Sequence, residues 1–124
     1  MVNHTNNDKI PKSERIVNGL LEEISECLTK KYHITPRAVN IAMPGGVVKL
    51  LGINFQILGP LSKQEIRRIL VFAAQDFISM VNANKEIHVF LEENKFALKN
   101  LAINLFLVSS TGIDLDHPNI GIAG

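Results

Sequence analysis

The spacing of apolar residues alternates between a helical period and a strand period along the chain, and this alternation constrains the fold most. From Lys12 to Tyr32 apolar residues recur every three or four positions, which predicts an amphipathic helix. Two period-two segments follow, Arg37 to Met43 and Val47 to Leu58, separated by the turn Pro44-Gly45-Gly46. So short a turn predicts an antiparallel hairpin.

The second half of the chain repeats this order of periods. Ser62 and Glu65 have the spacing of a capping box, which predicts the start of a second helix ending at about Asn82 or Asn84. A short further helix is expected over Lys85 to Glu93, and a third strand over Ala97 to Val108. After the turn Ser109 to Gly112 a short, weak fourth strand is expected, over either Ile113 to Leu115 or Ile120 to Ile122.

These segments predict an α+β fold, in which two main helices pack on one face of an antiparallel sheet of three to four strands. No linker or low-complexity segment divides the 124 residues. We therefore expect a single domain over residues 12–124, preceded by a disordered or extended tail over residues 1–11. The large aliphatic residues of each strand should face the helices.

The other face of the predicted sheet carries small and amide residues. Each strand places one asparagine near its middle, in the triplets Val39-Asn40-Ile41, Ile53-Asn54-Phe55 and Ile103-Asn104-Leu105. Asparagine is disfavoured in strands, so these positions are binding candidates together with Gln56 and Phe106. The alternative is that they are simply the solvated side of an antiparallel sheet.

Residues with catalytic or metal-binding chemistry are sparse. Asp114, Asp116 and His117 are weak candidates for a metal site, but a polar turn before Pro118 is the better interpretation of them. The single cysteine, Cys27, lies on the apolar stripe of the first helix and is expected to be inert. The pattern predicts no catalytic residues and no cofactor.

Charge and hydropathy restrict the possible partners. Lys and Arg number 13 and Asp and Glu 12, a balance that argues against nucleic-acid binding. No charge-free run reaches the length of a membrane span, and no signal peptide is visible. We therefore expect a cytoplasmic protein, or an exported one if a signal peptide has been removed.

Residues Leu61 to Leu107 carry a recognisable order of helix, short helix and strand. It includes the segments Met80-Val81-Asn82-Ala83-Asn84-Lys85-Glu86-Ile87 and Phe90-Leu91-Glu92-Glu93, then Phe96 and Lys99-Asn100-Leu101-Ala102-Ile103. This stretch resembles small uncharacterised bacterial proteins of the kind grouped as domains of unknown function. The resemblance implies a bacterial source and an exported relative, and it transfers no functional residue.

Two main functional hypotheses follow, beside a third, that the chain is a purely structural subunit. The first is a non-enzymatic binding or protein-interaction module whose uncharged sheet face contacts another protein or a second copy. The alternative is a small-molecule-binding protein or small enzyme with a pocket between sheet and helices, using His33, His88 or the cluster at Asp114. The absence of a catalytic motif favours the first.

Overall fold

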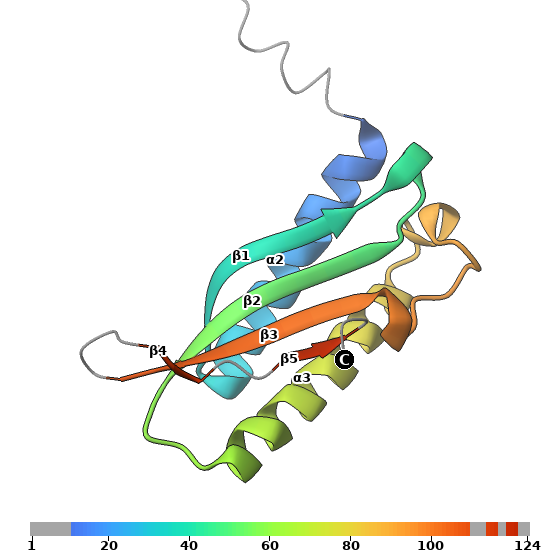
Figure 1. Cartoon of the computed structure of the whole chain (residues 1–124). Helices are drawn as coiled ribbons and strands as arrows, with labels where there is room; N and C mark the ends of the chain where they lie inside the picture. The colour runs from blue at the N-terminus through green and yellow to red at the C-terminus, as the bar shows by residue number, and fades with distance from the viewer. Residues whose placement is uncertain (1–10, 110–113, 117–118, 122–124) are drawn as a thin grey trace, which may run out of the picture.

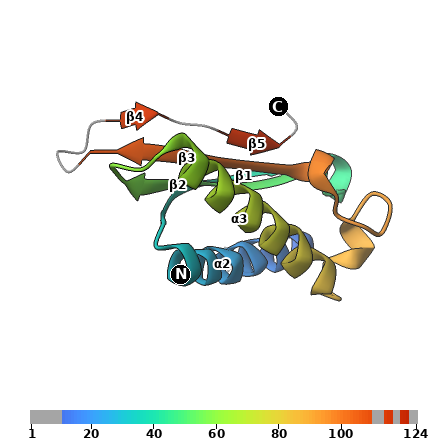
Figure 2. The same ribbon diagram turned by 90° about the horizontal axis from the view of Figure 1, so that it is seen from below.

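Two long helices lie on one side of a mixed sheet (Figure 2). The computed structural model describes residues 11–109, 114–116 and 119–121 of the chain. The sheet has the order β1-β2-β3, with the short strands β4 and β5 along the outer edge of β3 (Figure 1). The α+β class predicted from the sequence is confirmed. Residues 1–10 of the expected tail lie outside the described part.

The first helix, α2 (Lys12–Tyr32), has the bounds that its apolar spacing predicts. Its buried residues form one stripe: Val17, Leu20, Leu21, Ile24 and Leu28. The helix ends at His33, which takes a left-handed conformation with φ of 57° and donates its N–H to the carbonyl of Thr29. Pro36 then disfavours a helical conformation at Thr35, and the chain continues as a strand.

The predicted hairpin forms from β1 (Thr35–Ala42) and β2 (Leu50–Leu58), which pair antiparallel. A short 3₁₀ turn at Pro44–Gly46 begins the connection. Gly45 and Gly46 take φ values of 64° and 84°, a region that glycine adopts without steric penalty. The Pro-Gly-Gly signal therefore reflects a backbone requirement of this turn.

The second helix, α3 (Lys63–Ala83), begins with the capping box that the sequence predicts. Ser62 Oγ accepts the Glu65 N–H at 3.1 Å, and Glu65 Oε1 accepts the Ser62 N–H at 2.9 Å. The hydrogen bond from the Ser62 backbone is the main cause that lowers the pKa of the Glu65 carboxyl.

The direction of β3 (Leu101–Val108) corrects the prediction of a fully antiparallel sheet. β3 runs parallel to β2, with Leu51 opposite Leu101 and Leu58 opposite Val108. Because α3 and the segment after it carry the chain back along the sheet, the next strand starts at the same end as β2. β4 (Asp114–Asp116) and β5 (Asn119–Gly121) pair antiparallel with β3.

The segment between α3 and β3 also differs from its prediction. In place of a helix over Lys85 to Glu93 it contains only the 3₁₀ turn His88–Phe90, with a second such turn at Leu98–Asn100. Asn82 holds the segment with two bonds to the Phe96 backbone, each of 2.8 Å. The buried residues Ile87, Leu91 and Phe96 reach the core from this irregular segment, so their burial does not require a helix.

The space between the sheet and the helices is filled by apolar side chains. The largest of those with less than 2% exposure are Phe55, Phe77, Phe96, Ile24, Leu28, Ile34, Leu51, Ile53, Ile66, Ile87, Leu101 and Ile103. Phe77 of α3 and Phe96 stack with ring centroids 6.0 Å apart. This core includes the aliphatic sets of β2 and β3 that the alternation predicts to face inward.

A polar cluster joins the two helices at the end of α2. Asp76 of α3 accepts hydrogen bonds from the Lys31 ammonium at 2.9 Å and from the Tyr32 hydroxyl at 2.5 Å. Partial burial acts to raise the pKa of Asp76, but these two hydrogen bonds outweigh it and hold that pKa below its ordinary value. The hydrogen bond to Asp76 raises the pKa of Lys31.

Neither α2 nor α3 combines the length and apolar character that a membrane-crossing helix needs, and the same holds for the rest of the described chain.

Candidate interaction surface

The face of β1, β2 and β3 that the helices leave uncovered is here called the open face (Figure 2). The three asparagines predicted to share a face meet at its centre. Asn54 lies opposite Asn104 in the parallel register, and its Oδ1 accepts the Asn104 Nδ2 group at 2.6 Å. The same oxygen accepts the Asn40 Nδ2 group at 3.3 Å. The structure therefore links the three side chains in one amide row across three strands.

Small residues surround the amide row. A Cβ atom added to Gly52 would lie 1.9 Å from the carbonyl oxygen of Ala102, its partner on β3. Real Cβ atoms essentially never come that close, so this position admits only glycine unless the strands shift. With Ala102 on one side of Gly52 and Asn40 on the other, the middle of the open face carries no bulky side chain.

One end of the open face carries an aromatic residue with a cation above it. The Arg37 guanidinium lies 4.5 Å from the centroid of the Phe106 ring, a cation–π contact. Gln56 lies opposite Phe106 in the register between β2 and β3. The predicted binding residues Gln56 and Phe106 thus lie at the same end of this face. Leu58, which is 63% exposed, extends the face beyond them.

The sequence did not identify Arg37 as part of this surface. Strict alternation along β1 places Arg37 with Val39 and Ile41, on the side of the helices. The register shifts between Pro36 and Ala38, and this irregularity breaks the alternation at Arg37. A β-bulge has no signal in the spacing of apolar residues, so the expectation of an entirely uncharged face is corrected by one arginine.

The other chemical candidates are not brought together. His33 is exposed at the end of α2, whereas the Nε2 atom of His88 lies 2.8 Å from the carbonyl oxygen of Asn82. Cys27 is half-buried on α2. The described residues contain no group of three metal-ligating side chains. His117 and the side chains of Asp114 and Asp116 lie outside the described part.

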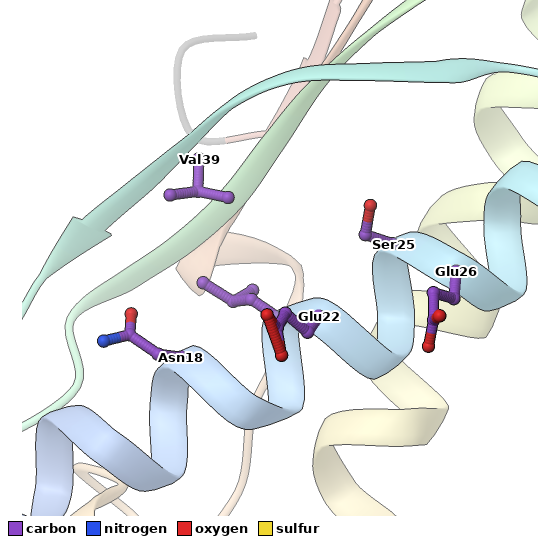
Figure 3. A pocket seen from close by; sticks show the side chains of 6 residues that line it. Asn18, Glu22, Ser25, Glu26 and Val39 are labelled. Atoms are coloured by element: carbon purple, nitrogen blue, oxygen red, sulfur yellow. The ribbon is translucent and has the colours of Figure 1, made fainter.

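Two hollows follow the side of α2 that faces β1. One has a volume of about 520 Å³ and lies between α2 and Val39, with Glu22 and Glu26 on its wall (Figure 3). The second, of about 350 Å³, is lined by Glu14 and Ile41. Neither of these two hollows is lined by His33 or His88, the histidines considered for a pocket between sheet and helices.

Exposure at β1 departs from the expectation that helices cover all the aliphatic strand residues. Val39 is 52% exposed and Ile41 is 39% exposed, although their register partners Ile53 and Leu51 are completely buried. The reason is position, because β1 is the outermost strand and α2 leaves a hollow beside it.

Comparison with known proteins gives no family assignment. No family model, no curated protein and no solved structure matches this chain. The resemblance to small bacterial proteins stays a prediction.

Proposed function

We propose that the protein is a non-enzymatic interaction module that pairs with a second copy of itself through the open face. The amide row of Asn40, Asn54 and Asn104 carries this proposal. It lies at the centre of a sheet face that neither helix covers (Figure 1). A chain that needed this face only for solvation would gain more solubility from charged residues.

A second copy suits the chemistry of the face. Each asparagine side chain carries both donors and an acceptor, so one amide row can hydrogen-bond with an identical row. The one arginine identified at this face, Arg37, lies against the Phe106 ring. Two copies facing each other therefore meet little like-charge repulsion, and an isologous contact requires such self-complementarity.

The size of the face limits the affinity. Three strands of eight or nine residues cover roughly 400 Å² at the usual strand spacing and rise. A standard stable interface buries about 800 Å² on each partner. We therefore expect a weak and reversible dimer, in which Phe106 and Arg37 supply the anchoring contacts.

Light scattering coupled to size exclusion tests the proposal. The mass of the untagged protein should rise from that of one chain toward two as its concentration increases. Asn54→Lys and Phe106→Asp should each abolish the rise. Phe72→Asp is the matched control, because Phe72 is 48% exposed on α3, away from the open face.

Two results would overturn the proposal. One is a wild-type mass that stays at one chain up to about 1 mM, a concentration at which an association worth only about 4 kcal/mol would already pair half of the chains. The other is a dimer that Phe72→Asp disrupts and Phe106→Asp does not, since the contact would then belong to the helix layer. Thermal unfolding of each variant shows that a lost dimer is not a lost fold.

A further inference from the structure

A second surface lies at the outer edge of β1, and it does not depend on the open face. We propose that this edge accepts an extended segment of a partner protein as an added strand, with lysine or arginine at alternate positions facing α2. Within the described part of the chain, four observations support the proposal: a strand edge with no pairing strand, exposed apolar residues on that strand, a hollow beside it, and glutamates lining the hollow that make no ion pair.

Backbone groups at this edge are turned outward. β1 is the terminal strand of the sheet, and no described strand pairs with its outer side. The carbonyl of Ala42 accepts the Lys49 N–H, so Ala42 turns toward β2. Because backbone groups alternate in direction along a strand, Ile41 and Val39 turn theirs to the free edge. These groups can form the hydrogen bonds that an added strand requires.

The middle of β1 lacks the features that usually prevent such pairing. Natural edge strands carry charges or prolines that discourage a further strand. In β1 these residues, Pro36 and Arg37, are confined to the first half, and Ala38 to Ala42 contain neither. Val39 and Ile41 are instead exposed apolar residues in this unprotected stretch.

The hollow provides space for side chains of the added strand. Val39 faces Asn18 and Glu22 of α2 across it (Figure 3). The second hollow, beside Ile41, is also lined by Asn18, so the two adjoin along α2. Alternate side chains of an added strand would point to the same side as Val39 and Ile41, and therefore into this space.

The negative charge of the residues lining the two hollows favours a positively charged segment. Glu14, Glu22 and Glu26 line the hollows, no cation does, and none of the three makes an ion pair within the described chain. Glu22 and Glu26 are four residues apart on α2, about 6 Å along the axis, where like charges repel. Alternate residues of a strand are about 6.6 Å apart, so a Lys-x-Lys segment can place one cation near each carboxylate.

The same charges disfavour a second copy at this edge. If β1 paired with the β1 of a second copy, the glutamate-lined sides of the two α2 helices would face the same solvent-filled space. A basic segment instead neutralises the wall, and its lysine stems can cover the exposed parts of Val39 and Ile41. The occupant we propose is therefore an extended basic segment of another protein.

A labelled eight-residue peptide of alternating lysine and valine, blocked at both ends, tests the site by fluorescence anisotropy. We expect saturable binding that weakens as salt increases. Glu22→Lys should weaken binding at least tenfold. Glu23→Lys makes the same charge change beside it, but Glu23 does not line the two hollows and the variant should retain most of the affinity. A glutamate–valine peptide should not bind.

Backbone pairing is tested by N-methylation of the same peptide. Methyl groups on one alternate set of amides should abolish binding, whereas the other set should tolerate them, because only one set faces β1. Equal effects of the two sets, or equal effects of Glu22→Lys and Glu23→Lys, would overturn the proposal. So would a Glu22→Lys variant that changes the solution mass, since the occupant would then be a second copy. None of these variants touches the open face, so the two proposals fail independently.

Discussion

The two faces of the sheet are built by the same strands and have opposite chemistry. On the covered face, Leu51, Ile53 and Phe55 of β2 are all completely buried. On the open face, the alternating positions Asn54 and Gln56 are half-buried and polar. The covered face therefore supplies the burial of apolar side chains that stabilises the fold. The amides of the other face are partly satisfied by one another, and this leaves the face available for contact.

The largest expected difference between the faces is the effect of removing a phenylalanine. Phe55→Ala leaves a cavity in the core and should lower the free energy of unfolding by about 3–5 kcal/mol. Phe106→Ala on the open face removes a half-buried ring and its contact with Arg37, and should lower it by about 1 kcal/mol. Urea unfolding at low protein concentration measures both. If Phe55→Ala and Phe106→Ala lowered the free energy of unfolding by similar amounts, the open face would also be part of the core.

The second prediction addresses Gly52, a position of the open face where the close approach of β3 leaves no room for a side chain. Gly52→Ala forces the new Cβ against the Ala102 carbonyl, which should destabilise the protein by about 3 kcal/mol. Gly19→Ala is the control, because a Cβ at Gly19 meets nothing within 4 Å and the position is inside α2. Gly19→Ala should raise the free energy of unfolding by about 0.5–1 kcal/mol, because alanine has a higher helix propensity than glycine. If Gly52→Ala left the free energy of unfolding unchanged, β2 and β3 would have to move apart easily at this position.

Much of this comparison was predictable from the sequence, because burial and solvation alternate with the period of a strand. The spacing predicted the bounds of α2, and the capping residues Ser62 and Glu65 predicted the start of α3. The alternation also predicted that Asn40, Asn54 and Asn104 share a face, and the structure confirms this. Each of these features depends on residues close together in the chain.

The remaining features depend on relations between distant segments. The period of a strand is the same in parallel and antiparallel pairs, so the spacing in β3 could not give its direction. The hollow beside Val39 depends on where α2 lies across the sheet, which the pattern of either element alone does not determine. Arg37 was missed because the register irregularity at its position has no sequence period.

The third prediction separates the structural and binding roles of the amide row. Asn54→Ala removes the oxygen that accepts from both Asn40 and Asn104, and should lower the free energy of unfolding by about 1 kcal/mol. Asn54→Asp keeps an acceptor in the same place and should recover most of that loss at pH 7. Asn54→Asp should nevertheless weaken self-association, because it places a negative charge at the centre of the open face in each of the two copies. An Asp variant that dimerises normally would contradict a contact through this face.

The smallest expected effect concerns the covered side, where Asp76 joins the two helices. A carboxyl whose pKa is lowered by folding stabilises the protein above its unfolded pKa, and this contribution is lost as the pH falls through the folded pKa. Tyr32→Phe removes one of the two hydrogen bonds to Asp76. At pH 7 it should cost about 0.5–1 kcal/mol, because the site is partly solvated.

That difference should narrow in acid, as the pH falls below the ordinary carboxyl range through the lowered pKa of Asp76 and this carboxyl becomes protonated in both proteins. Burial is the main cause that raises the pKa of Tyr32, so the contribution of this hydroxyl is present below its unfolded pKa and is lost as the pH rises through its folded pKa. The stability difference between wild type and Tyr32→Phe should therefore be greatest near neutral pH and smaller at both extremes. Urea unfolding from pH 3 to 11 measures it. A difference independent of pH would show that the Tyr32 hydroxyl does not act through the charge of Asp76, and the junction of the two helices would then not depend on that ionised carboxyl.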